Sequence, residues 1–237
     1  GSLTRIDLSS VEELGDYAFF GQMSLEDVTL GSGLKEISKY AFAYCVTLSE
    51  INLDSVEIIR EGAFFYNIGS TNLTDTYPGA GLTELNMPEV RIVEAGAFEY
   101  ALWVEKVNMP KVEEVGEMAF SGLLATATDS SGNQWNVILS SLKEVTLPTD
   151  SEIDVVLNNG AFYLSGSLET INCERVVSMG DAVFMYCMSV KEINAPECTE
   201  IGQMCFYQAE SATKIYVPLI EEVPDGAFLG TEALTSV

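Results

Sequence analysis

The sequence VKEINAPECTEIGQMCFYQ, residues 190–208, contains three short patterns in a fixed order. It begins with a block of the form L-x-x-I-x-L, whose alternating apolar residues predict a short β-strand with one buried face. Pro196 then ends the strand, because proline lacks the N–H that a longer ladder needs. A step of the form V-x-x-I predicts a corner that can contain a second short strand. The pair Cys205-Phe206, which is Ala-Phe in most other copies, predicts a short helical turn.

This unit recurs along the whole chain. Most intervals between successive copies are 22 or 23 residues, and nine of the 11 phenylalanines occupy a single column. That column consists of Phe19, Phe42, Phe64, Phe98, Phe120, Phe162, Phe184, Phe206 and Phe228. One unit cannot bury its own apolar edge, whereas stacked units bury all their edges in one continuous core. The sequence therefore predicts a solenoid of nine rungs with a spine of phenylalanines.

The charge balance restricts the partners. The 237 residues include 11 Lys and Arg against 36 Asp and Glu, which gives a formal net charge of −25. Such a surface repels nucleic acid and anionic lipid, so we expect neither as a partner. The chain has no run of about 18 apolar residues and no signal peptide, so we expect no membrane-spanning segment in it.

The residue types also argue against catalysis. The sequence has no histidine, which is the commonest general base and the commonest zinc ligand. No two of the 36 acids stand out as a glycosidase pair. The loop Asp129–Asn133 supplies one carboxylate, where calcium loops use several. We therefore expect no enzyme, no catalytic residue, no cofactor and no metal site.

With the strand block, the corner and the Ala-Phe pair assembled, the chain resembles the BspA-like class of leucine-rich repeats. That class has the pattern L-x-x-I-x-L-P-x-x-V-x-x-I-G-x-x-A-F-x-x-C, and residues 190–208 match it well. The resemblance implies a leucine-rich-repeat solenoid of the α/β horseshoe type, rich in β-structure. It would have short parallel strands stacked in about nine rungs, short helical turns, and one domain spanning residues 1–237.

The same resemblance implies a biological setting. Members of the class look like secreted or surface-anchored bacterial proteins that display repeats for adhesion and protein contact. The resemblance therefore implies an extracellular or cell-surface location for this chain. The class brings no catalytic residues that could be carried over to it.

Insertions interrupt the regular array near residues 70–81, 123–140 and 151–157. In the second insertion, segments 125–128 and 134–137 flank a loop of about five residues, which predicts a β-hairpin. The first two insertions both follow an Ala-Phe pair, so both should leave the solenoid at the same edge.

Aromatic residues gather at these insertions. Tyr77 lies in the first insertion, Trp135 in the predicted hairpin, and Trp103 at the matching turn of the rung between them. Exposed aromatic side chains there would form a contact surface for a protein or a glycan. Alternatively, the hairpin folds down and buries its own tryptophan over the rungs. Tyr77, Trp103 and Trp135 are therefore candidate ligand-binding residues.

A polar column follows the outer face of the predicted first strands. It consists of Asp7, Thr29, Asn52, Asn86, Asn108, Thr146, Asn172, Asn194 and Tyr216. Side-chain amides stacked about 4.8 Å apart can hydrogen-bond from rung to rung. Alternatively, the column faces a ligand from a concave surface, and Asn86 and Asn108 are then further candidate binding residues.

The five cysteines all occupy apolar columns of the repeat. They are Cys45, Cys173, Cys187, Cys198 and Cys205. Their number is odd, no C-x-x-C pair exists, and buried thiols behave as small hydrophobes. We predict free, buried thiols, with a disulfide or a reactive thiol as the alternative.

Three functions are compatible with these observations. The first is a non-enzymatic binding or adhesion scaffold that contacts a surface protein of a host or of a neighbouring cell. The second is a glycan-binding surface module that uses the aromatic residues at the loop edge. The third is a passive spacer within a larger surface protein.

Overall fold

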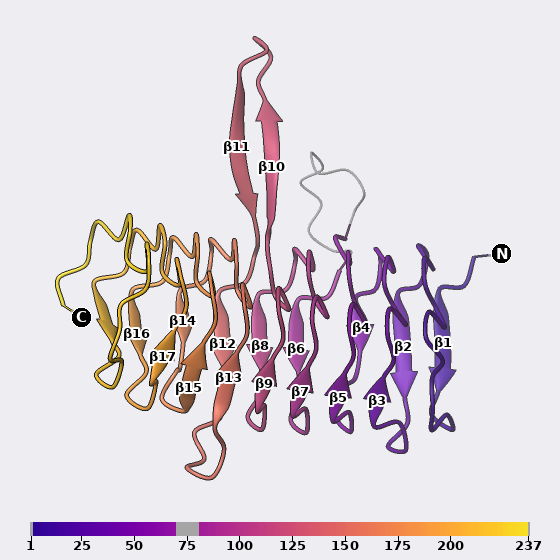
Figure 1. The fold of residues 1–237 in the computed structure, drawn as a ribbon. Coiled ribbons are helices and arrows are strands. Elements are labelled where there is room, and N and C mark those ends of the chain that lie inside the picture. Colours follow the sequence, from indigo (N-terminus) through magenta and orange to yellow (C-terminus); the bar gives the residue numbers. More distant parts are fainter. Residues whose placement is uncertain (1, 70–80, 237) are drawn as a thin grey trace.

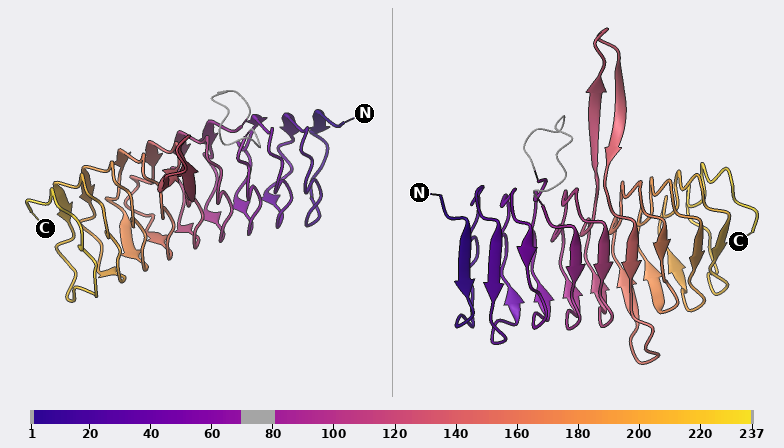
Figure 2. Two further views of the ribbon diagram at one scale, coloured as in Figure 1. Left: turned by 90° about the horizontal axis from the view of Figure 1, so that it is seen from above. Right: turned by 180° about the vertical axis from the view of Figure 1, so that it is seen from behind.

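A computed structural model describes residues 2–69 and 81–236 of the chain (Figure 1). It shows an elongated stack of rungs with the two termini at opposite ends and one hairpin projecting from the middle. Two further views show the same stack from above and from behind (Figure 2). The predicted solenoid of stacked rungs is confirmed.

Each of the nine rungs begins with a strand that runs parallel to the first strands of its neighbours. These strands are β1 (Arg5–Leu8), β2 (Asp27–Leu30), β4 (Glu50–Ile51), β6 (Glu84–Asn86), β8 (Lys106–Asn108), β12 (Glu144–Thr146), β14 (Thr170–Ile171), β16 (Glu192–Asn194) and β18 (Lys214–Tyr216). They form three parallel sheets, in the orders β1-β2-β4, β6-β8-β12-β14 and β16-β18. The register keeps the columns aligned, because Val107 pairs with Leu85 on one side and Val145 on the other.

The corner step forms a second strand in seven rungs. These strands are β3 (Glu36–Ile37), β5 (Ile58–Ile59), β7 (Ile92–Val93), β9 (Glu114–Val115), β13 (Val155–Leu157), β15 (Val176–Met179) and β17 (Glu200–Ile201). Together they make one continuous parallel sheet, so the second strand allowed by the sequence is real. One hydrophobic core runs between the two strand layers from rung to rung.

The predicted phenylalanine spine lies along this core. Neighbouring rings in the column are stacked, with centroids 4.9–5.8 Å apart and planes inclined by no more than 18°. Stacking of this kind adds about 0.5–1.5 kcal/mol per pair to the gain from burial. The spine therefore links every rung to the next.

The Ala-Phe segment is a series of turns, so the prediction of short helical turns was wrong. Within the described residues there is no helix. In the second rung, successive backbone N–H groups bond alternately within the rung and to the next rung. The N–H of Ala41 donates to the carbonyl of Ser38 in its own turn, whereas the N–H of Phe42 donates to the carbonyl of Ala63 in the next rung. Tyr40 and Tyr44 have φ values of 52° and 58°. Left-handed residues at this spacing stop a helix from propagating, and pairing between rungs replaces its hydrogen bonds.

The glycines before the Ala-Phe segment permit close packing of one rung on the next. A Cβ at Gly202 would lie 2.3 Å from the backbone nitrogen of Asp181. A Cβ at Gly116 would lie 2.5 Å from the carbonyl carbon of Glu94. Neither glycine has a positive φ, which agrees with a packing role rather than a conformational one.

Candidate binding surfaces

The predicted hairpin is confirmed as β10 (Leu123–Thr128) and β11 (Gln134–Leu139). The two strands pair antiparallel, with Ala125 opposite Val137 and Ala127 opposite Trp135. They leave the solenoid beside the Ala-Phe turns and extend away from it (Figures 1 and 2). The side chain of Trp135 is 50% exposed, so the hairpin does not bury its tryptophan against the rungs.

One face of this hairpin is entirely apolar. Directly opposed residues of an antiparallel pair project from the same face. Leu123, Ala125 and Ala127 therefore share a face with Leu139, Val137 and Trp135, respectively. Between residues 123 and 139 the only charged side chain is Asp129, although the chain as a whole has a net charge of −25. The hairpin that projects from the solenoid therefore carries very little of the charge of the chain.

Asp129 closes the loop of the hairpin. Its Oδ1 accepts hydrogen bonds from the backbone N–H groups of Ser131 and Asn133, and its Oδ2 accepts one from the Asn133 side chain at 2.8 Å. The hydrogen bond from the Asn133 side chain is the main reason why the pKa of Asp129 is below its usual value. The carboxylate therefore fixes the shape of the tip.

Trp103 is less exposed than Trp135. The Trp103 side chain is half-buried, and its indole N–H donates to the carbonyl of Ile68 at 2.6 Å. It also packs on Gly81, where a Cβ would lie 3.0 Å from the indole Cδ1. Tyr77 lies outside the described residues. Of the two tryptophans, Trp135 is therefore the one exposed to solvent.

The strand-face amides are engaged in contacts between rungs. Asn108 on β8 donates to the Oδ1 of Asn86 on β6 at 2.8 Å. Asn172 accepts from the backbone of Leu147 at 2.7 Å and donates back to it at 2.9 Å. These bonds confirm that the polar column links neighbouring rungs. Asn86 is nevertheless exposed, so the column remains accessible to a ligand.

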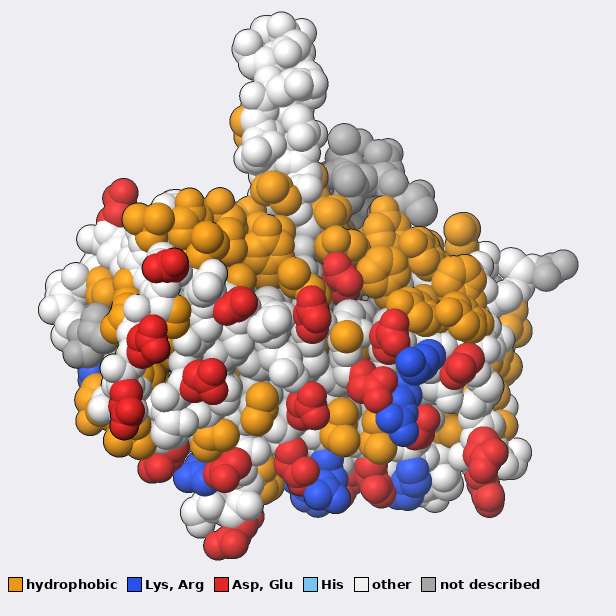
Figure 3. Space-filling model, in the orientation of Figure 1, with side chains coloured by type: hydrophobic (Ala, Val, Ile, Leu, Met, Phe, Trp, Pro, Cys, Tyr) orange, Lys and Arg blue, Asp and Glu red, His pale blue; other side chains and the backbone are white. Residues whose placement is uncertain are grey.

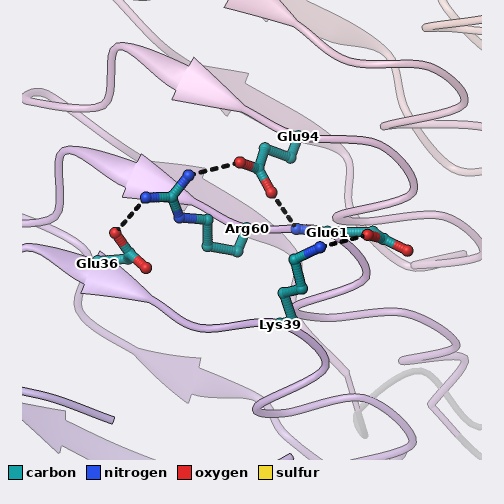
Figure 4. Close-up of polar contacts among 5 residues, drawn as sticks. All are labelled: Glu36, Lys39, Arg60, Glu61 and Glu94. Atoms are coloured by element: carbon teal, nitrogen blue, oxygen red, sulfur yellow. Dashed lines mark hydrogen bonds and ion pairs between the residues drawn. The ribbon is translucent and has the colours of Figure 1, made fainter. Parts of the chain in front are cut away.

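Ion pairs cross the rungs on the face of the seven-stranded sheet. Arg60 on the third rung bridges Glu36 at 2.6 Å and Glu94 at 2.7 Å, and Lys39 pairs with Glu61 at 2.9 Å (Figure 4). The hydrogen bond from Arg60 holds the pKa of Glu36 below its usual range. Acids outnumber bases by 36 to 11, so this pairing leaves most carboxylates without a basic partner.

All five cysteines are free and buried, as predicted. Burial raises the pKa of the Cys45 thiol to about 11 and also raises the pKa of the other four thiols. Because the thiolate is the reactive form, these side chains are packing residues.

Two further features bear on the chemistry of the surface. The described residues contain no group of three or more His, Cys, Asp or Glu side chains placed to hold a metal ion. The described part of the chain also contains no helix with the length and apolarity needed to cross a bilayer.

The repeat pattern matches a known family over most of the chain. The model of the BspA type leucine-rich repeat region, in six copies, matches residues 2–126 and 138–237. The chain belongs to this family. The segment left out of the match, residues 127–137, is the outer part of the hairpin, so the BspA type repeats continue on both sides of it. No curated protein matches the chain.

The chain is also similar to solved structures of leucine-rich repeat proteins. A leucine-rich repeat protein from T. pallidum is 22% identical, with a TM-score of 0.54, over 90% of this chain and 79% of its own. A leucine rich cell surface protein from Faecalibacterium prausnitzii is 21% identical, with a TM-score of 0.37, over 98% of this chain and 77% of its own. A leucine-rich repeat protein from Bacteroides ovatus is 14% identical, with a TM-score of 0.34, and the coverage is again 98% and 77%. The first of these likenesses supports the fold.

A further aromatic surface escaped the sequence analysis. Tyrosines recur two residues before and two residues after the spine phenylalanines, as Tyr17, Tyr40, Tyr44, Tyr66, Tyr100 and Tyr186. None of these tyrosines is fully buried: Tyr17 is exposed and the other five are half-buried. In Figure 3 the hydrophobic side chains gather in a band above the charged sheet face, on both sides of the base of the hairpin. The sequence feature that could have predicted this surface is the column of tyrosines on either side of the spine phenylalanines.

Proposed function

We propose that this chain is a non-enzymatic binding scaffold of the cell surface, and that hairpin β10–β11 is the part that contacts a partner protein. The partner would be a surface protein of a host or of a neighbouring cell. One observation carries the proposal: a hairpin whose two strands carry no charged side chain, and which presents the half-exposed Trp135, stands clear of a strongly acidic body. Supporting the surface location, the relative from Faecalibacterium prausnitzii is described as a cell surface protein.

Exposure of this hairpin to water is unfavourable, and a partner can relieve it. A two-stranded hairpin is marginally stable by itself in water, and its strand edges present unpaired backbone groups. A partner that covers Trp135 and Val137 buries apolar area, and desolvated tryptophans often dominate binding energy. Because the two strands of the hairpin carry no charged side chain, contact with them involves little desolvation of ions. Its projection also keeps the partner away from the carboxylates of the body.

Glycan binding through loop-edge aromatics is the second candidate, and the exposure of Trp135 favours it. A sugar ring can stack on an exposed indole face, which the half-buried Trp103 offers less well. Tyr77, Asn86 and Asn108 remain candidates for additional contacts on the loop edge and the strand face. A passive spacer is the third candidate, since the rungs form an elongated stack with the termini at opposite ends (Figure 1).

The test is a binding screen of the purified chain against extracellular-matrix proteins and a glycan array. Trp135→Ala should weaken a binding signal at least about tenfold, because it removes the central apolar anchor. Thr126→Ala, on the opposite face of the hairpin, is the matched control and should leave affinity unchanged.

The other outcomes separate the candidates. The class of ligand retained on the array distinguishes a protein from a glycan. A signal that survives Trp135→Ala but is lost in Asn86→Ala/Asn108→Ala would place the site on the strand face and refute the hairpin proposal. Absence of binding to every ligand tested would favour the spacer.

A further inference from the structure

The tyrosines and phenylalanines of the first four rungs form a continuous aromatic stripe along the Ala-Phe turns. It consists of Tyr17, Phe20, Tyr40, Tyr44, Phe65, Tyr66 and Tyr100. Tyr17 stacks on Tyr40 with centroids 5.2 Å apart, and Phe20 lies 5.3 Å from Tyr44. Tyr17 is 55% exposed and Phe20 is 45% exposed. The stripe is therefore open to solvent at its N-terminal end.

A groove of about 400 Å³ runs beside this stripe. Its floor includes Gly62 and Gly96, both with φ of 60°. In the same column the neighbouring rungs carry Tyr40 and Met118, so two successive rungs lack a side chain there. The Tyr40 ring covers Gly62, where a Cβ would lie 2.2 Å from the ring. A Cβ at Gly96 would meet only the Glu99 side chain, so the groove is open above Gly96.

Three carboxylates line the groove, on Glu61, Glu99 and Glu117. Glu61 is satisfied, because it pairs with Lys39 at 2.9 Å and accepts from the Tyr40 hydroxyl at 3.1 Å. Among the ion pairs of the described residues, none involves Glu99 or Glu117. Glu99 is half-buried, and burial raises the pKa of its carboxyl above the usual value. A cation next to it would offset that unfavourable burial.

The position of Glu99 is also unusual within the repeat. The residue that follows the spine phenylalanine is aromatic in several rungs, as in Phe65, Tyr163 and Tyr207. In the fourth rung this column carries the carboxylate of Glu99, which lines the groove together with aromatic residues that include Tyr40 and Phe65. Aromatic faces together with a carboxylate that has no ion-pair partner among the described residues form a site suited to a guanidinium, because the rings attract its flat face and the carboxylate accepts its N–H groups.

We propose that this groove binds a cationic segment of another protein, with an arginine side chain stacked on the tyrosine rings and paired with Glu99. Charge complementarity supports this occupant, since the chain has a net charge of −25. The same charge disfavours a second copy of the chain, which would bring like charges together. The site is separate from hairpin β10–β11, so it does not depend on the function proposed for the hairpin.

The experiment is a titration with the blocked peptide Gly-Arg-Gly-Arg-Gly, followed by NMR at about 150 mM salt to screen non-specific attraction. The reference peptide contains citrulline in place of arginine, which has almost the same shape and no charge. We expect the arginine peptide to shift resonances of the groove and the citrulline peptide to leave them unchanged. Glu99→Gln should weaken binding at least about tenfold, because it removes a charge-assisted hydrogen bond.

Matched variants separate the groove from the general acidity of the surface. Glu197→Gln removes an equal charge from an exposed position on the eighth rung, and Trp135→Ala alters the hairpin. Both should leave peptide affinity within about twofold. Gly96→Met should abolish binding by filling the groove. The column accepts this residue, because Met118 and Met204 have φ values of 54° and 53° there.

Several results would overturn the proposal. They are failure of the arginine peptide to bind, equal binding of the citrulline peptide, and equal weakening by Glu99→Gln and Glu197→Gln. Dimerisation of the chain in light scattering that Gly96→Met abolishes would identify a second copy as the occupant instead. Should Gly96→Met not fold, the comparison between Glu99→Gln and Glu197→Gln decides by itself.

Discussion

Phe162→Ala should lower the free energy of unfolding by about 3–5 kcal/mol, measured by urea denaturation. Phe162 is fully buried and stacks on Phe120 at 5.6 Å and on Phe184 at 5.8 Å. Truncation removes the buried apolar surface, leaves a cavity between rungs and breaks both stacking contacts. A solenoid is sensitive to such a change, since each rung is stabilised mainly by its two neighbours.

Phe20→Ala is the control for this prediction. Phe20 lies one residue after the spine position and is 45% exposed, so its truncation should cost about 1 kcal/mol or less. The same residue type is removed in both variants, and only the environment differs. Equal losses of stability would show that the phenylalanine column does not hold the rungs together.

Gly202→Ala should lower the free energy of unfolding by about 1–3 kcal/mol, a typical cost of overpacking. The new Cβ would lie 2.3 Å from the Asp181 nitrogen and 2.4 Å from the Gly180 carbonyl carbon. These are backbone atoms, which cannot rotate away as a flexible side chain would, so the rungs must separate. Thermal or urea denaturation measures the loss.

Gly15→Ala provides the matched control in the same column. Nothing lies within 4 Å of the position that its Cβ would occupy, and its φ is not positive. This variant should be as stable as the parent or slightly more stable, because alanine reduces the freedom of the unfolded chain. A loss for Gly15→Ala as large as that for Gly202→Ala would contradict the packing explanation.

The periodic parts of this fold could be predicted from the sequence. Alternating apolar residues predicted the first strand of the rung, and the Phe column predicted the spine, because each pattern recurs in successive rungs. The V-x-x-I corner allowed a second short strand without requiring it. The turns could not be predicted in the same way. Tyr40 and Tyr44 adopt a left-handed conformation that residue type does not reveal. The pairing of N–H groups between rungs, which only the assembled stack supplies, selects that conformation.

The binding surfaces were only partly predictable. The alternation around Asp129 indicated a hairpin, but it left the direction open, because the apolar face with Trp135 could equally have covered the rungs. The groove beside the aromatic stripe depends on Gly62 and Gly96 lacking a side chain that Tyr40 and Met118 possess. Because glycine is common in turns, these two glycines do not indicate a groove in the sequence. The groove can be recognised only when the rungs are stacked.

The surfaces divide the molecule into regions with different roles. The buried spine and the amide bonds between rungs hold the stack together, and the spine residues are too buried to contact a ligand. Hairpin β10–β11 and the aromatic groove contribute little to the core and present apolar surface to solvent. Function in this repeat protein is thus expected where the sequence departs from the repeat.

The most direct test of that account shortens the hairpin. Replacing residues 126–136 with Asn-Gly joins Ala125 to Val137, which are opposite one another, through a two-residue turn. The base of the hairpin, including Leu123 and Leu139 that pack against the rungs, stays in place. We expect the shortened chain to have the same melting temperature as the parent chain. We expect it to lose the binding that the parent chain shows in the ligand screen. Full binding by the shortened chain, or a collapse of its stability, would contradict the claim that the hairpin serves recognition rather than folding.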